Sequence, residues 1–114
     1  MGKFAFEKRE RLAKRSQFEH VISQGHKQNI ATFCTIFFLT NSLNMKRLGI
    51  IASKKIGNAV IRNQAKRKIR EAFRHIKHRI EPAIDIVVIS GKDLVSLPSS
   101  VLEKRIFQSF PVKR

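Results

Sequence analysis

The segment SKKIGNAVIRNQAKRKIREAFR, residues 53–74, decides how this chain folds and indicates what it contacts. Its apolar residues recur at the three- and four-residue spacing of an amphipathic helix, so one side is predicted to pack on a core. Between Lys54 and Arg79 there are ten lysine or arginine residues and one acidic residue. Because like charges at helical spacing repel each other, so basic a helix is typical of a surface that binds a polyanion.

Residues 59–80 have two distinct faces when they are projected onto a helix of 3.6 residues per turn. The apolar face is predicted to pack on the core and contains Ile61, Ala65, Ile69, Ala72, Phe73, Ile76 and Ile80. The basic face is predicted to contact an anion and contains Asn63, Lys66, Arg67, Arg70, Arg74 and Lys77, with Arg62 at the boundary. A solvated face is the alternative, but a merely soluble helix would mix charges of both signs.

Gly57 lies in the loop just before this helix. A glycine there either lets the backbone approach a phosphate at the positive end of the helix, or only makes the turn. Both interpretations stay open on the sequence alone. The loop is not a P-loop, because the required Gly-Lys-Ser/Thr is missing.

The whole chain is strongly basic: 24 lysine and arginine residues against 8 acidic residues give a formal net charge of +16 over 114 residues. This length predicts a single domain over 1–114, and the charge indicates nucleic acid as the first partner class and an anionic membrane surface as the second. No apolar run approaches the roughly 20 residues of a membrane span, and no signal-peptide pattern opens the chain, so a cytoplasmic location is expected. Cys34, the only cysteine, is expected to be a small core residue.

One helix is predicted near the start of the chain. Residues 1–15 are weakly patterned and are expected to form a partly ordered basic arm. Ser16 and Glu19 have capping-box spacing, so a helix is predicted over 16–24 with Gly25 as its C-cap.

The strands and the last helix follow from apolar pattern and turn residues. Residues 31–40 predict a strand that has apolar residues on both faces. After a turn at 41–44, residues 47–53 predict a strand antiparallel to the first, because the link is short. Residues 83–90 predict a third strand, and a capping-box pattern at 100–103 opens a final helix. Its inward residues are predicted to be Leu102, Ile106 and Phe110. This order indicates a split βαβ unit in an α+β domain.

Several motifs in the chain resemble the signature of the bacterial ribonuclease P protein family. They are Arg47-Leu-Gly49, residues 53–60, Arg62-Asn63, Lys66-Arg67 and residues 70–74, and Leu12, Lys14, Phe18 and the strand 85–89 also fit. The resemblance covers nearly the whole chain. It implies a single α+β domain of αβββαβα order, with a split, left-handed βαβ crossover in a two-layer sandwich like that of some ribosomal proteins. The family's additional strand is expected from a break within 27–40.

The resemblance also implies a function. The protein would be the RNA-binding cofactor of ribonuclease P, the endoribonuclease that removes the 5′ leader of precursor tRNA. The RNA subunit would carry out the hydrolysis with Mg²⁺, so no catalytic residue, metal or other cofactor is expected on the protein. The partners would be the ribonuclease P RNA and precursor tRNA, with no membrane and no small-molecule substrate.

Two sets of residues would contact RNA, by their positions in the family. The set for the leader, in a central cleft, is Phe18, Ile22, Ile36, Lys55, Asn63, Lys66 and Arg70. The set for the catalytic RNA is Lys54, Arg62, Arg67 and Arg74. The chain departs from the family pattern at Gln64, where arginine is usual, and at Ile22 and Ile36, where aromatic residues are common. Because stacking on an aromatic ring is worth roughly 1–3 kcal/mol per base, this cleft is expected to rely more on phosphates and Phe18.

Two other functions stay open on the sequence alone. A ribosomal protein or a general RNA chaperone would be equally basic. An autonomous nuclease would need clustered carboxylates for its divalent ions, and the eight acidic residues are scattered. His75 and His78 could share a metal, but no cysteine or carboxylate partner is evident, so a solvated pair is favoured.

Overall fold

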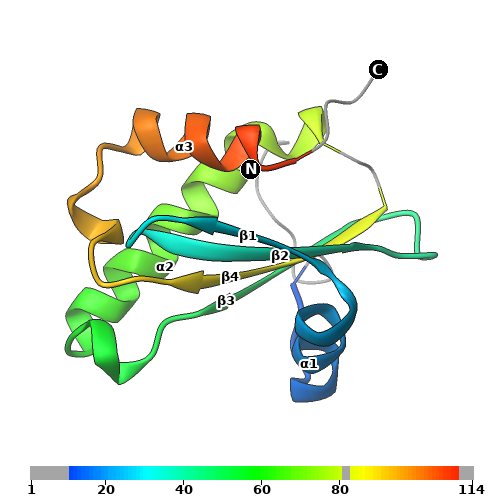
Figure 1. Cartoon of the computed structure of the whole chain (residues 1–114), viewed down its shortest axis with the longest axis horizontal. Helices are drawn as coiled ribbons and strands as arrows, with labels where there is room; N and C mark the ends of the chain where they lie inside the picture. The colour runs from blue at the N-terminus through cyan, green and yellow to red at the C-terminus, as the bar shows by residue number, and fades with distance from the viewer. Residues whose placement is uncertain (1–10, 81–82, 111–114) are drawn as a thin grey trace, which may run out of the picture.

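The computed structural model describes residues 11–80 and 83–110 of the chain. The main elements are α1 (Arg15–Gln24), β1 (His26–Ile30), β2 (Cys34–Thr40), β3 (Lys46–Ile51), α2 (Ala59–Ile76), β4 (Ile84–Ser90) and α3 (Ser99–Gln108) (Figure 1). Three short 3₁₀ turns accompany them: η2 (Lys54–Ile56), η3 (Lys77–Arg79) and η4 (Leu94–Ser96). The order αβββαβα in one α+β domain confirms the fold class predicted from the sequence.

The four strands form one mixed sheet in the order β1-β2-β4-β3. β2 runs antiparallel to both β1 and β4, whereas β3 and β4 are parallel neighbours joined through α2. The strand predicted over 47–53 is therefore antiparallel to β2 as expected, but β4 lies between them. The left-handed sense of the β3–α2–β4 crossover stays a prediction.

The break expected within 27–40 is confirmed, because the strand predicted over 31–40 is only the second arm of a hairpin. β1 pairs with β2 from His26 to Ile30, and residues 31–33 form the turn. Ala31 makes this turn with a positive φ of 45°. β1 lacks a hydrophobic pattern because it is an edge strand in which only Ile30 is buried.

Helices cover both faces of the sheet, α2 and α3 on one side and α1 on the other (Figure 1). Alternation along β2 separates the two layers: Cys34 and Ile36 belong to the main core under α2 and α3, whereas Phe37 belongs to the smaller cluster under α1. The apolar face predicted over 59–80 is confirmed. Six of its seven residues are buried, namely Ala65, Ile69, Ala72, Phe73, Ile76 and Ile80.

The start of α1 differs from the predicted capping box. Its N-cap is Lys14, and Ser16 lies inside the first turn. Gln17 supplies the cap instead, because its Oε1 accepts the backbone N–H groups of Ala13 and Lys14, both at 2.9 Å. The helix ends at Gly25 as predicted, where a Cβ would lie 2.4 Å from one backbone carbonyl oxygen of α1 and 2.8 Å from one of β2. This close approach requires glycine.

The other two helices begin in different ways. At α2, the Asn58 side-chain oxygen accepts the Ile61 N–H at 3.0 Å. Gly57 before it has φ +148°, a conformation that L side chains rarely adopt. α3 begins at Ser99 after Pro98, so the predicted capping box at Ser100 does not form.

A buried ion pair ties β3 to β4. Arg47 and Asp85 lie directly opposite each other in the sheet, and Asp85 is 4% exposed. Arg47 donates two hydrogen bonds to the carboxylate, at 2.8 and 2.7 Å, and the Asn41 amide donates a third at 2.7 Å. The hydrogen bond to Asp85 raises the pKa of Arg47.

Candidate nucleic-acid interface

The face of the sheet under α1 is apolar and only partly covered. Its buried centre consists of Leu12, Val21, Phe37 and Val87. Half-buried side chains surround that centre, namely Phe18, Ile22, Leu39, Ile51 and Ile89. We call these nine residues together the α1 cluster. Its half-buried members offer an apolar surface to a ligand.

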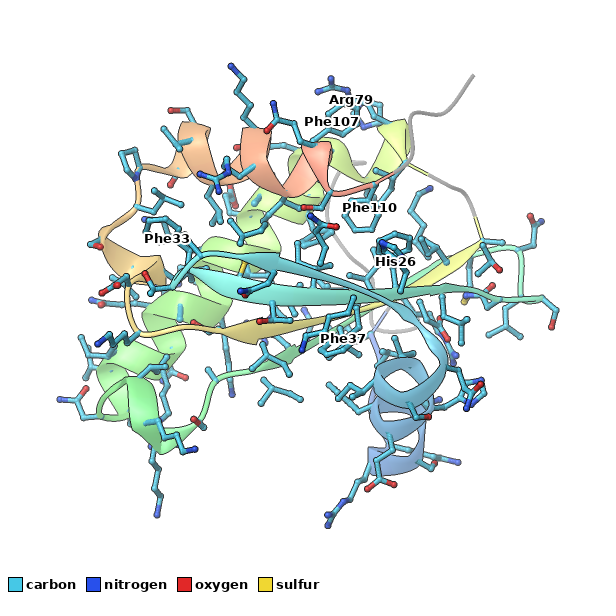
Figure 2. The ribbon with its side chains drawn as sticks, in the orientation of Figure 1. His26, Phe33, Phe37, Arg79, Phe107 and Phe110 are labelled. Atoms are coloured by element: carbon cyan, nitrogen blue, oxygen red, sulfur yellow. The ribbon has the colours of Figure 1, made fainter. Side chains whose placement is uncertain are left out.

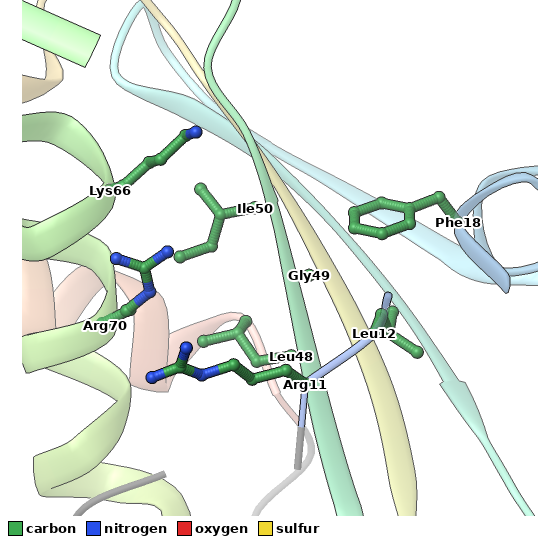
Figure 3. Close-up of a pocket in the computed structure, with 8 residues that line it drawn as sticks. All are labelled: Arg11, Leu12, Phe18, Leu48, Gly49, Ile50, Lys66 and Arg70. Atoms are coloured by element: carbon green, nitrogen blue, oxygen red, sulfur yellow. The ribbon is translucent and has the colours of Figure 1, made fainter. Parts of the chain in front are cut away.

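A small basic cavity lies beside the α1 cluster, at the edge of β3. This β3-edge pocket has a volume of about 120 Å³ and is lined by Arg11, Leu12, Phe18, Leu48, Gly49, Ile50, Lys66 and Arg70. Figure 3 shows Lys66 and Arg70 reaching from α2 toward β3, with Arg11 beside Arg70 and Phe18 across the strand. Three cations and one aromatic ring therefore converge on one pocket.

The backbone around β3 holds the parts of this pocket in place. Arg11 forms a parallel bridge with Leu48, and the Leu12 N–H donates to the Leu48 carbonyl at 3.0 Å. Gly49 allows the Phe18 ring to lie directly on the strand, since a Cβ at Gly49 would be only 2.5 Å from the ring. The ring is thus fixed against the backbone on one side.

Within residues 11–80 and 83–110, no acidic side chain forms an ion pair with Arg11, Lys66 or Arg70. Burial lowers the pKa of the Arg70 guanidinium, and the positive charge of Arg11 lowers it further. An anion between these side chains would relieve this repulsion, and a phosphate has the size and hydrogen-bonding geometry for it.

The structure brings together only part of the leader set predicted from the sequence. Phe18, Lys66 and Arg70 meet in the β3-edge pocket, and Ile22 lies in the neighbouring α1 cluster. Ile36 does not join them, because it is fully buried in the main core on the other face of the sheet. Successive side chains of a strand point to opposite faces, so its neighbour on this face is Phe37.

The remaining predicted residues lie on η2 and α2. Lys54 and Lys55 are exposed on η2, and Asn63 and Arg67 are exposed on α2. Arg62 is half-buried.

Arg62 and Arg74 differ in their partners. The Nε of Arg62 is buried and has no hydrogen-bond partner among the described residues. Arg74, by contrast, forms an ion pair with Glu71, and its hydrogen bond lowers the pKa of that carboxyl. This nitrogen of Arg62 therefore lacks a partner among the described residues, whereas part of the Arg74 guanidinium is already engaged.

Sequence reasoning gave no site role to Arg11, Gly49 or Phe37, although Gly49 belongs to the Arg47-Leu-Gly49 motif of the family resemblance. Arg11 falls in the segment predicted as a partly ordered arm; residues 1–10 of that arm lie outside the described residues. Apart from the positive charge of Arg11, no local pattern marks these residues as neighbours of Lys66, because their contacts cross the chain. Among the described residues, no group of three or more His, Cys, Asp or Glu side chains could hold a metal ion. Within the same residues, no helix has the length and hydropathy to cross a membrane.

Comparisons with known proteins agree on one family. The family model for ribonuclease P matches residues 6–111. The ribonuclease P protein component of Desulfatibacillum aliphaticivorans is 38% identical over 102 residues, which cover 90% of this chain and 86% of the relative. That of Syntrophus aciditrophicus is 42% identical over 97 residues, covering 85% and 81%.

Solved structures give the same answer. The RNase P protein from Thermotoga maritima has a TM-score of 0.77 and 30% identity, covering 89% of this chain and 94% of that one. The Staphylococcus aureus RNase P protein has a TM-score of 0.75 and 32% identity, covering 87% and 90%. The chain therefore belongs to the ribonuclease P protein family, the protein component of the endoribonuclease that matures the 5′ end of tRNA.

Proposed function

We propose that the β3-edge pocket and the α1 cluster bind the single-stranded 5′ leader of precursor tRNA. The observation that carries this proposal is the meeting of Arg11, Lys66 and Arg70 with the Phe18 ring in one pocket. Such a site offers cations to the leader phosphates and an aromatic surface to a base, the two features of non-specific single-strand binding. Lys55 and Asn63 are proposed to extend the contact along the leader.

The catalytic RNA is proposed to bind the exposed side of η2 and α2. Lys54 and Arg67 supply charge there, and the half-buried Arg62 adds a guanidinium whose Nε has no hydrogen-bond partner among the described residues. Arg74 contributes less in this proposal, because Glu71 already holds its guanidinium.

The chemistry of cleavage is assigned to the RNA subunit. We propose that Mg²⁺ is held by RNA, while the protein raises the affinity for precursor tRNA. No residue of the protein is proposed to touch the reacting phosphate, and the cytoplasm is proposed as the compartment in which the holoenzyme acts.

Reconstitution with a cognate ribonuclease P RNA tests this function. The protein should increase 5′ maturation at low Mg²⁺ and should bind the RNA less tightly as salt rises, because phosphate contacts release counterions. Lys66→Ala and Arg70→Ala should weaken precursor binding. Arg105→Ala, which removes one charge from α3 on the other side of the sheet, serves as the control and should leave precursor binding unchanged. No increase in maturation would reject the function, and precursor binding unaffected by Lys66→Ala and Arg70→Ala would reject the site.

A further inference from the structure

A second cavity lies between the C-terminal end of α2 and α3, on the side of the sheet away from the α1 cluster. Its volume is about 240 Å³, and its lining is Ile76, Arg79, Ser100, Glu103, Lys104 and Phe107. Figure 2 shows Arg79 and Phe107 together beside α3, with the sheet between them and Phe37. This α2–α3 cavity plays no part in the leader site.

A cation stacked on a ring forms one wall of the cavity. The guanidinium carbon of Arg79 lies 4.2 Å from the centre of the Phe107 ring. Phe107 is half-buried and packs against the main core, whereas Arg79 is exposed. The ring therefore supports one side of the guanidinium, and a planar group can stack on the side that faces solvent.

The charge around the cavity favours an anionic ligand. Glu71 and Glu103 are the acidic residues of the described parts of α2, η3 and α3, and of these two Glu103 lines the cavity. Arg74 forms an ion pair with Glu71, and Glu103 lies 2.8 Å from the Nδ1 atom of His75. The two cations Arg79 and Lys104 outnumber the one carboxylate, that of Glu103, among the side chains that line the cavity.

We propose that the α2–α3 cavity is a second RNA-binding site, which takes an unpaired nucleotide of the catalytic RNA. The base stacks on the Arg79–Phe107 pair, Lys104 contacts the adjacent phosphate, and Ser100 offers a hydroxyl to the base or the ribose. A base on an aromatic or guanidinium plane with a nearby cation is the usual recognition of unpaired RNA.

The catalytic RNA is the occupant that the geometry favours over the leader. The sheet separates the cavity from the α1 cluster. Arg67, proposed to contact the catalytic RNA, lies on α2 nine residues before Ile76, about 14 Å along the helix. Because Arg67 and Ile76 lie half a turn apart around the helix, an RNA molecule that contacts Arg67 must pass around α2 to reach the cavity. This inference rests on the proposed function.

Equilibrium binding of the full chain to cognate ribonuclease P RNA, without tRNA, tests the site. Arg79→Ala and Phe107→Leu should each weaken binding by at least about fivefold, the lower bound for loss of one stacked base. Arg79→Lys keeps the charge but lacks the planar group, so it should also bind weakly. Arg105→Ala, on α3 but outside the cavity, should stay within about twofold of the unchanged protein, with the circular dichroism of each variant confirming its fold.

The possible results separate this inference from the proposed function. If the unchanged protein fails to bind the catalytic RNA, the proposed function is overturned and this site with it. If the unchanged protein binds, but Arg79→Ala and Arg79→Lys bind equally well, only the α2–α3 site is overturned. Loss of affinity that occurs only with leader-bearing precursor would also overturn it, because the occupant would then be the leader.

Discussion

Gly49→Ala tests how the fold positions the ring that we assign to the leader. A Cβ at this position would lie 2.5 Å from Cε2 and 2.6 Å from Cζ of Phe18. The ring must retreat by about 1 Å to reach the ordinary contact distance of about 3.5–4.0 Å. Overpacking of this kind costs about 1–3 kcal/mol of folding free energy. The substitution leaves every cation of the β3-edge pocket in place.

The assay is binding of precursor tRNA to the reconstituted holoenzyme, with mature tRNA as the reference substrate. Displacing the ring should remove base stacking worth roughly 1–3 kcal/mol, so precursor affinity should fall by about 5-fold to 150-fold while mature tRNA binds as before. Urea unfolding of the free protein measures the packing cost separately.

A double-mutant cycle gives the result that would refute the reasoning. In a Phe18→Ala background the clash with the ring is gone and only the tight 3.1 Å contact with the Cβ of Leu12 remains, so adding Gly49→Ala should cost little further affinity and less stability than it does beside the ring. If Gly49→Ala has the same effect with and without the ring, Gly49 does not act through Phe18, and the placement of the ring is wrong.

Three further predictions address the ion pair, the buried thiol and the missed cation. Asp85→Asn should lower the free energy of unfolding by about 3–5 kcal/mol, because it leaves the largely buried Arg47 charge without its partner. Urea denaturation measures this loss, and a value below about 1 kcal/mol would contradict the prediction. Burial raises the pKa of the Cys34 thiol from 9.0 to about 12. Because the unfolded chain loses this proton at a lower pH than the folded protein, the contribution of the neutral thiol to stability is complete below pH 9 and is lost as the pH rises toward 12. The unchanged protein should therefore lose about 1 kcal/mol more than Cys34→Ala between pH 9 and pH 10, and equal losses would contradict the shift. Arg11→Ala should weaken precursor binding in the same direction as Lys66→Ala, and unchanged leader-dependent affinity would remove Arg11 from the site.

The sequence predicts α2 well because the pattern there is long and regular. Over 18 residues, the apolar spacing separates the core face from the basic face, and the structure buries Ala65, Ile69 and Phe73 as expected. The N-cap at Asn58 and the glycine before it begin the helix where the pattern begins. A strong local signal and the tertiary structure agree in this segment.

The strands are harder to predict because their pattern is ambiguous. Both faces of β2 are apolar, so the spacing cannot decide whether Ile36 or Phe37 faces α1, and an error of one residue exchanges the two sides. β1 is a polar edge strand and has no pattern at all. The site roles of Arg11 and Gly49 could not be predicted for another reason, because these roles depend on contacts with residues distant in the sequence.

The most direct test of the central claim compares two substrates of the reconstituted enzyme, precursor tRNA with its leader and the same tRNA without it. The account predicts that the protein tightens binding of the leader-bearing substrate selectively, and that the double variant Lys66→Ala/Arg70→Ala loses most of this selectivity. Equal tightening of both substrates, or selectivity that survives the double variant, would contradict the claim that this face of the protein holds the leader.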